Sequence, residues 1–217
     1  MSRRADRRQS ERAHAYKLCS LALQYPDDEI IAGRSKLATA AAELPRGPIR
    51  ESLDQFFAWF EHARGLELAQ HYVQTFDLHK RTGLYVTFYS HGDRRERGLV
   101  LLRLRQLYRA AGLPTDEGEL PDYLPLMLEF AAAADPERGG LVLREHRPAL
   151  EVIRLSLHEQ ESPYRHVLDA VCELVGGLTA LERLSLDRLL AQGPPQELVG
   201  LEPLAPPEVM PSVEARR

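Results

Sequence analysis

The sequence contains only two cysteines, Cys19 and Cys172, which stand too far apart to form a CxxC metal or redox pair. A disulfide framework needs several paired cysteines, so none is expected, and a reducing compartment fits this composition. No apolar run approaches the roughly 20 residues that a membrane-spanning helix requires. The paired arginines before Gln9 lack the apolar region of an export signal. We therefore expect a cytoplasmic protein with no direct membrane insertion.

A large excess of charge of one sign is also missing. The 28 lysines and arginines nearly balance the 32 aspartates and glutamates, and the formal net charge is -4. This balance gives no overall attraction to a phosphate backbone, so nucleic acid is not an expected partner. The chain of 217 residues is 44% hydrophobic and 28% charged, which fits one soluble domain with a sizeable core.

Motifs for catalysis and metal binding are scarce. No dinucleotide-binding, P-loop or nucleophile-elbow glycine pattern occurs. The Glu-x-x-His pattern, which a di-iron bundle needs on two helices, occurs once, ending at His14. His-Glu-x-x-His is absent. We expect a protein that is not an enzyme and has no metal site, and the alternative is a metal-dependent helical enzyme that uses His71, Asp77 or His91.

Apolar residues recur at helical spacing through most of the chain. The heaviest apolar face is Ile49, Leu53, Phe56, Phe57 and Phe60, and such a face is typical of a core. We predict an all-α, single-domain bundle of roughly eight or nine helices over residues 10–202. Ser10 is expected to cap the first helix, and Pro148 to kink or restart the helix of residues 141–161. A basic flexible arm over 1–9 and a proline-rich flexible tail over 203–217 complete the chain.

The stretch from Leu84 to Tyr89 has the β-branched and aromatic composition of a strand. A single strand has nothing to pair with, and no second such run occurs. We interpret this stretch as a buried helical or extended connector whose tertiary setting overrides its propensity.

Residues 119–130, ELPDYLPLMLEF, form an acidic, proline-marked entrance to a very apolar helix. Asp122 is placed to accept the unpaired N–H groups of the first turn, with Pro125 at the third helical position. Carboxylates are stabilised near the positive end of a helix. Capping and the binding of a basic partner therefore both remain open for Glu119, Asp122 and Glu129.

A further helix is expected after Asp93, because Asp93-Arg94-Arg95-Glu96 matches a capping box. Its outer face carries a set of arginines: Arg94, Arg95, Arg97, Arg103, Arg105 and Arg109. Such a face is usually only solvated, and a docking surface is the alternative.

Five blocks of sequence, in order, resemble the NarJ family. They are YVQTFD at 72–77, residues 84–98, residues 119–130, SPY at 162–164, and residues 193–203. This family comprises the nitrate reductase delta subunits, or molybdenum cofactor assembly chaperones, within the wider TorD/DmsD group of redox-enzyme maturation proteins. The resemblance covers Tyr16 to about Pro203 and leaves out the arginine-rich N-terminus and the last residues.

The resemblance implies an all-helical chaperone without catalysis of its own. Its client is the apo catalytic (α) subunit of a membrane-bound respiratory nitrate reductase, bound at its N-terminal peptide, with the α–β complex as a further candidate partner. The chaperone assists molybdenum cofactor insertion and delays membrane attachment. It binds no cofactor stably and handles the molybdenum cofactor only through the client. The alternative is a general helical maturation adaptor for another molybdoenzyme.

The resemblance also assigns a client-peptide site, residue by residue. The tyrosines line an apolar groove, and the carboxylates meet basic client groups or position the helix entrance. The expected site residues are Tyr72, Asp77, Tyr85, Tyr89, Glu119, Asp122, Tyr123 and Glu129.

Overall fold

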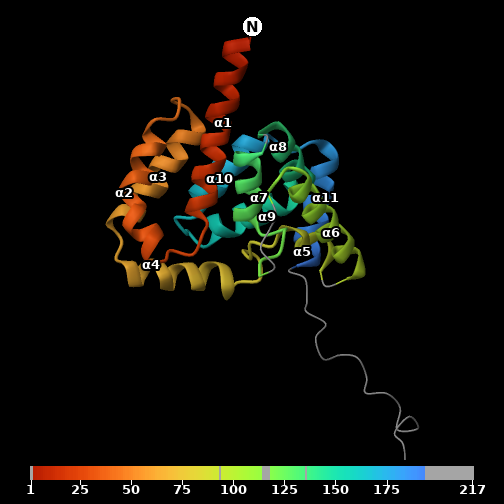
Figure 1. Ribbon diagram of the computed structural model, residues 1–217. Coiled ribbons are helices and arrows are strands. Elements are labelled where there is room, and N and C mark those ends of the chain that lie inside the picture. The colour runs from red at the N-terminus through yellow and green to blue at the C-terminus, as the bar shows by residue number, and fades with distance from the viewer. Residues whose placement is uncertain (1, 93, 114–117, 135, 194–217) are drawn as a thin grey trace, which may run out of the picture.

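The computed structural model describes residues 2–92, 94–113, 118–134 and 136–193, and these ranges contain eleven α-helices and no strand (Figure 1). The prediction of an all-α fold is confirmed. The helices are α1 (Ser2–Ala22), α2 (Asp28–Ala42), α3 (Pro48–His62), α4 (Gly65–Tyr72), α5 (Val86–His91), α6 (Arg95–Ala110), α7 (Leu124–Ala133), α8 (Pro136–Glu145), α9 (Arg147–Glu159), α10 (Arg165–Val175) and α11 (Ala180–Gln192). A π-helical turn, η1 (Val73–Asp77), continues α4. No helix in the described ranges is both long and apolar enough to span a membrane.

Two helices more than expected arise from local sequence features. The stretch with strand-like propensities forms the short helix α5, which confirms its interpretation as a buried connector. The region around Pro148 is divided, since α8 ends at Glu145 and α9 begins at Arg147. Pro148 occupies the first turn of α9, where its missing N–H has no intrahelical partner to lose. Proline therefore restarts the helix rather than kinking it.

The first helix begins at Ser2, so the expected start at Ser10 was wrong. Alanine and arginine favour helices, and Arg7 Nε donates to Glu11 Oε1 at 2.8 Å across one helical turn. The N-terminal part of α1 extends beyond the rest of the bundle (Figure 1). The division into arm, domain and tail stays a prediction, and residues 203–217 lie outside the described ranges.

The core gathers around α7, the most apolar of the described helices, which packs against α1 and α8. On the other side of the bundle, α3 packs between α2 and α10. Phe56, Phe57 and Phe60 of α3 are at most 1% exposed, so the aromatic face belongs to the core as predicted. Burial of several such rings contributes about 2–3 kcal/mol each relative to exposure.

A glycine fixes the close approach of α8 to α7. A Cβ atom added at Gly139 would lie 2.2 Å from Ala131 Cα, which is a backbone atom that cannot rotate away. We expect Gly139→Ala to lower the free energy of unfolding by about 3 kcal/mol. The matched control is Gly33→Ala in α2. No atom lies within 4 Å of a Cβ added there, so alanine should raise the free energy of unfolding by about 1 kcal/mol. Urea unfolding measures both, and equal effects would contradict the close contact.

Candidate functional site

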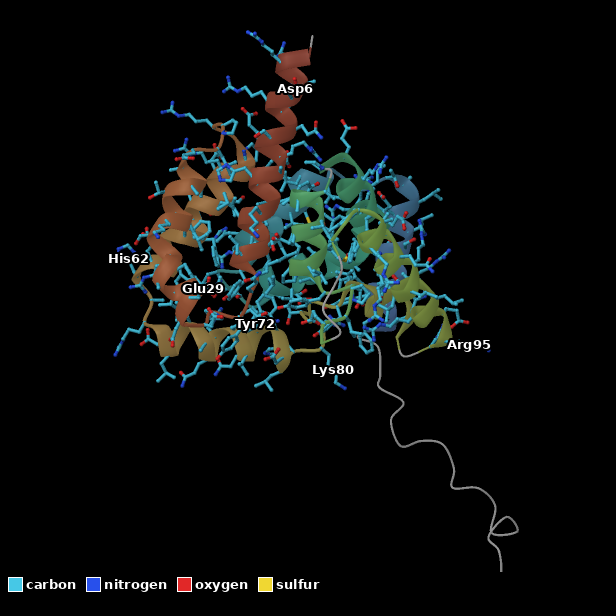
Figure 2. The ribbon with its side chains drawn as sticks, viewed as in Figure 1. Asp6, Glu29, His62, Tyr72, Lys80 and Arg95 are labelled. Atoms are coloured by element: carbon cyan, nitrogen blue, oxygen red, sulfur yellow. The ribbon has the colours of Figure 1, made fainter. Side chains whose placement is uncertain are left out.

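A pocket of about 250 Å³, here called the tyrosine pocket, is formed by four separate segments of chain. They are the turn after α1, the end of α4 with η1, the loop before α5, and the loop before α7. The lining residues are Tyr25, Tyr72, Phe76, Asp77, Gly83, Leu84, Tyr85, Glu119 and Tyr123. Five of the eight expected site residues are therefore brought together, and Figure 2 places Tyr72 at the end of the bundle opposite Asp6.

A short backbone ladder aligns the two loops of this pocket. Val86 N donates to Asp122 O at 3.1 Å, and Leu124 N donates to Leu84 O at 2.8 Å. The pair forms an isolated antiparallel bridge between Tyr85 and Tyr123, whose rings lie 5.4 Å apart. The strand-like composition of the first loop is thus used for one bridge, which sets two tyrosines side by side.

The tyrosine hydroxyls are held in a defined direction. Tyr72 Oη donates to the backbone carbonyl of Leu23 at 3.1 Å and lies 3.0 Å from Tyr123 Oη. Because Tyr72 has a single hydroxyl proton, Tyr123 is the donor in the second bond. Burial raises the pKa of both phenols, so both remain protonated at neutral pH.

Two carboxylates give the pocket its charge. Asp77 ends η1 and is exposed, and no described residue forms an ion pair with it. Glu119 Oε1 accepts hydrogen bonds from Tyr85 Oη at 3.1 Å and Leu120 N at 2.8 Å, again without a cation among the described residues. Burial, and then the Glu119 carboxylate, raise the pKa of Tyr85 to about 12, which keeps its hydroxyl a donor. The pocket thus has mainly aromatic walls and a negative rim.

A second hollow of about 400 Å³, here called the adjoining pocket, shares Phe76, Asp77, Gly83 and Tyr85 with the first. Tyr89, another expected site residue, lines it, but its ring is 7% exposed and its hydroxyl donates to Gly83 O at 2.9 Å. Lys80, labelled near Tyr72 in Figure 2, also belongs to this hollow. The two hollows adjoin at these four shared residues, and together, here called the groove, they are lined by charged residues of both signs.

Asp122 lines neither hollow of the groove and is 0% exposed. The expected cap of its own helix was wrong, because α7 begins at Leu124 with Tyr123 as its N-cap. Instead the Asp122 carboxylate accepts from Thr87 N at 3.3 Å, Thr87 Oγ1 at 2.5 Å and Arg97 Nη2 at 3.1 Å. It therefore satisfies the first turn of α5 and ties that turn to α6. Its reach to a client stays a prediction, and in this conformation the side chain faces no solvent.

Glu129 lies apart from the groove. Its Oε2 atom accepts from Lys17 Nζ of α1 at 2.5 Å, and both side chains are partly exposed. This pair joins α7 to α1. Asp93, the expected first residue of a capping box, lies outside the described ranges, and Arg94 is the N-cap of α6.

The sequence did not point to Tyr25 and Phe76 as pocket residues. Tyr25 belongs to the apolar periodicity of the first helix, yet it follows the end of α1 and is 48% exposed. Its ring packs edge-on against Tyr72 at 5.4 Å. Phe76 is placed by the π-helical turn, a feature with no clear sequence signal that is frequent at functional sites.

The histidines considered for a metal site are dispersed. His71 Nε2 lies 2.9 Å from Ser162 Oγ, and its ring stacks on Tyr164. Within the described ranges, no three histidine, cysteine, aspartate or glutamate side chains are grouped so that they could hold a metal ion. His71 is thereby accounted for by packing.

The half-buried His71 and the buried His146 predict a pH dependence of stability. Burial lowers the pKa of His71 and His146 below the ordinary value. Below about pH 6.5 the unfolded chain binds protons that the folded protein does not. The contribution of the two neutral imidazoles to the free energy of unfolding is therefore present above that pH and decreases as pH falls. Between about pH 7 and pH 5, the free energy of unfolding should fall by about 1 kcal/mol less in His146→Gln than in the wild type, as measured by urea unfolding. A pH dependence of His146→Gln identical to that of the wild type would contradict the prediction.

Comparison with known proteins gives the chain its family. The family model described as nitrate reductase delta subunit matches residues 42–169, a range that holds every expected site residue. A Bacillus subtilis protein named "Probable nitrate reductase molybdenum cofactor assembly chaperone NarJ" is 38% identical over 176 residues, 80% of this chain and 96% of that protein. The Escherichia coli K12 nitrate reductase molybdenum cofactor assembly chaperone NarJ is 28% identical over 159 residues, 72% of this chain and 67% of that protein.

A third relative is larger. The nitrate reductase-like protein NarX of Mycobacterium tuberculosis H37Rv is 36% identical over 159 residues, 72% of this chain but 24% of that protein. The Bacillus and Escherichia relatives are named as assembly chaperones and not as enzymes, in agreement with the expectation that this chain is no enzyme. On the match over more than half of its residues, the chain belongs to the nitrate reductase delta subunit family.

Proposed function

We propose that this chain is a dedicated chaperone that binds the apo catalytic (α) subunit of a respiratory nitrate reductase in the cytoplasm. Binding assists molybdenum cofactor insertion and assembly of the enzyme complex, and it precedes membrane attachment. Family membership supports the client enzyme, and the groove supports a peptide ligand. The observation that carries the proposal is a tyrosine-walled pocket with two carboxylates at its rim that form no ion pair with described residues.

The pocket suits one basic side chain of a client peptide. Its volume of about 250 Å³ lies below the range of about 300–1,000 Å³ that is usual for small-molecule sites. Tyrosine faces attract a cation, and a carboxylate doubles the strength of its hydrogen bonds relative to neutral ones. A basic client residue between Asp77 and Glu119 would therefore contact tyrosine faces and form hydrogen bonds to carboxylates. The N-terminal peptide of the α subunit, as a helix, would place its apolar side along the adjoining pocket.

The chain itself holds no cofactor stably in this proposal. The molybdenum cofactor is cargo that enters the client while the chaperone is bound. The α–β complex is a second binding partner, at a later stage of the same assembly.

Measurement of molybdenum in the client tests the function. The α subunit purified from cells that lack this chain should have lost most of its molybdenum by mass spectrometry, and the wild-type chain should restore it. Asp77→Asn with Glu119→Gln should fail to restore it, whereas Glu129→Gln, remote from the groove, should succeed. Full molybdenum content without the chain would contradict the proposal. Loss from a different molybdoenzyme instead would identify a general adaptor.

A further inference from the structure

The outer face of α6 carries an exposed stripe, here called the α6 stripe: Arg95, Leu99, Leu102, Gln106 and Arg109. The residues are spaced by four, three, four and three positions, so they share one side of the helix. Leu99 is 66% exposed and Leu102 is 52% exposed, while Leu104 and Tyr108 on the opposite side are buried. Figure 2 shows Arg95 at the outer edge of the molecule.

The arginines at the ends of the stripe are not neutralised by the described part of the chain. Arg103 pairs with Glu145 at 3.1 Å and Arg97 with Asp122, but no described carboxylate forms an ion pair with Arg95 or Arg109. Two exposed leucines thus lie between two uncompensated cations. This pattern is complementary to a segment with apolar residues between two carboxylates.

Such a segment follows α11 in the same chain. Residues 197–202 read Glu-Leu-Val-Gly-Leu-Glu, and residues 194–215 contain four glutamates and no lysine or arginine. The lengths also agree. The stripe rises about 21 Å from Arg95 to Arg109 at 1.5 Å per residue, and five steps from Glu197 to Glu202 amount to about 16 Å at the polyproline II rise of 3.1 Å, a geometry in which residues three apart share one side. Long arginine side chains cover the difference.

The fold keeps α6 and α11 near each other. Arg144 of α8 pairs with Glu182 of α11 at 2.7 Å, and the next residue, Glu145, pairs with Arg103 of α6. Successive residues of α8 therefore contact both helices, α11 at its first turn and α6 near its middle. The sequence continues from Gly193 at the end of α11 through residues 194–196 to residues 197–202, the first acidic segment after that helix.

We propose that residues 197–202 dock on the α6 stripe, with Leu198 and Leu201 on the exposed leucines and the two glutamates at Arg95 and Arg109. Docking covers an apolar patch that the described helices leave in solvent. The inference is independent of the client proposed above.

Chemical crosslinking of the full chain tests this contact. Leu102→Cys with Leu201→Cys is treated with a short bismaleimide, and the product is identified by mass spectrometry. Native Cys19 and Cys172 are buried, and burial raises the pKa of both thiols, so they react poorly. We expect an intramolecular product in at least about tenfold higher yield than from Gln55→Cys with Leu201→Cys, whose first residue is exposed on α3.

Charge reversal makes the result specific. Arg95→Glu with Arg109→Glu should lower the yield towards that of the control pair, and Glu197→Arg with Glu202→Arg, added to it, should restore the yield. Arg95 and Arg109 are exposed, so their substitution should leave the circular dichroism spectrum unchanged. Equal yields from the α6 and α3 pairs, a product that joins two chains, or no response to charge reversal would each overturn the proposal.

Discussion

Arg97→Ala should lower the free energy of unfolding by about 4 kcal/mol, because it leaves a buried carboxylate without its cation. Asp122 is 0% exposed and Arg97 is 15% exposed, and Arg97 Nε also donates to Thr87 Oγ1 at 3.1 Å. The guanidinium lies 5.4 Å from the centre of the Phe88 ring. For a domain of this size the melting temperature should fall by about 10 °C, measured by circular dichroism.

Arg103→Ala is the matched control. Arg103 is on the same helix and pairs with Glu145 at a similar distance, but the two side chains are 73% and 51% exposed. An exposed pair contributes about 0–1 kcal/mol, so the melting temperature should change little. Equal falls for the two variants would contradict a special role of the buried pair.

A second variant of the same ion pair, Asp122→Ala, tests the role of Asp122. Asp122→Ala should also destabilise the protein strongly, since it removes the buried acceptor of Thr87 N, Thr87 Oγ1 and Arg97 Nη2. Client affinity is then measured well below the melting temperature of the variant. If the affinity equals that of the wild type, the client-binding role expected for Asp122 is wrong and its role is to position α5.

The second large effect is expected on client affinity. Asp77→Asn with Glu119→Gln keeps the size of both side chains and one acceptor oxygen in each, replaces the other oxygen by an NH2 donor, and removes both charges. A hydrogen bond to a charged group contributes about 1.5–3 kcal/mol, so the dissociation constant of the α-subunit peptide should rise about 10- to 100-fold. Fluorescence anisotropy of a labelled peptide measures this change.

Glu129→Gln is the control for that measurement. It removes a carboxylate that pairs with Lys17 on α1, outside both pockets of the groove. We expect the affinity of this variant for the peptide to stay within about twofold of that of the wild type. An exposed ion pair contributes little even to local stability. Weaker binding by Glu129→Gln than by the double variant would move the client to the α1–α7 face.

Helical periodicity was sufficient to predict the all-α fold and the aromatic core of α3. It was insufficient to place the ends of helices, because these depend on contacts between segments that are distant in sequence. Asp122 illustrates the limit. Its position before an apolar helix predicts a cap, and the structure uses it as an acceptor for Thr87, 35 residues earlier. No local sequence pattern predicts that contact.

The same distinction holds for the site. The sequence resemblance gave the tyrosines and carboxylates but not their arrangement, which depends on the Tyr85–Tyr123 bridge and on a π-helical turn. Tyr25 joins the pocket because α1 ends before it, although its spacing fits the apolar periodicity of that first helix. The resemblance placed Glu129 in one site with Glu119, but Glu129 lies within α7 and pairs with Lys17 of α1, whereas Glu119 lines the tyrosine pocket.

The most direct test of the proposed function is calorimetric titration of the full chain with the N-terminal peptide of the apo α subunit from the same genome. We predict saturable one-to-one binding that weakens on Asp77→Asn with Glu119→Gln and on Tyr72→Phe, which removes the hydroxyl bonded to Leu23 and Tyr123. Absence of binding by a protein shown to be folded would contradict recognition of the client through this peptide.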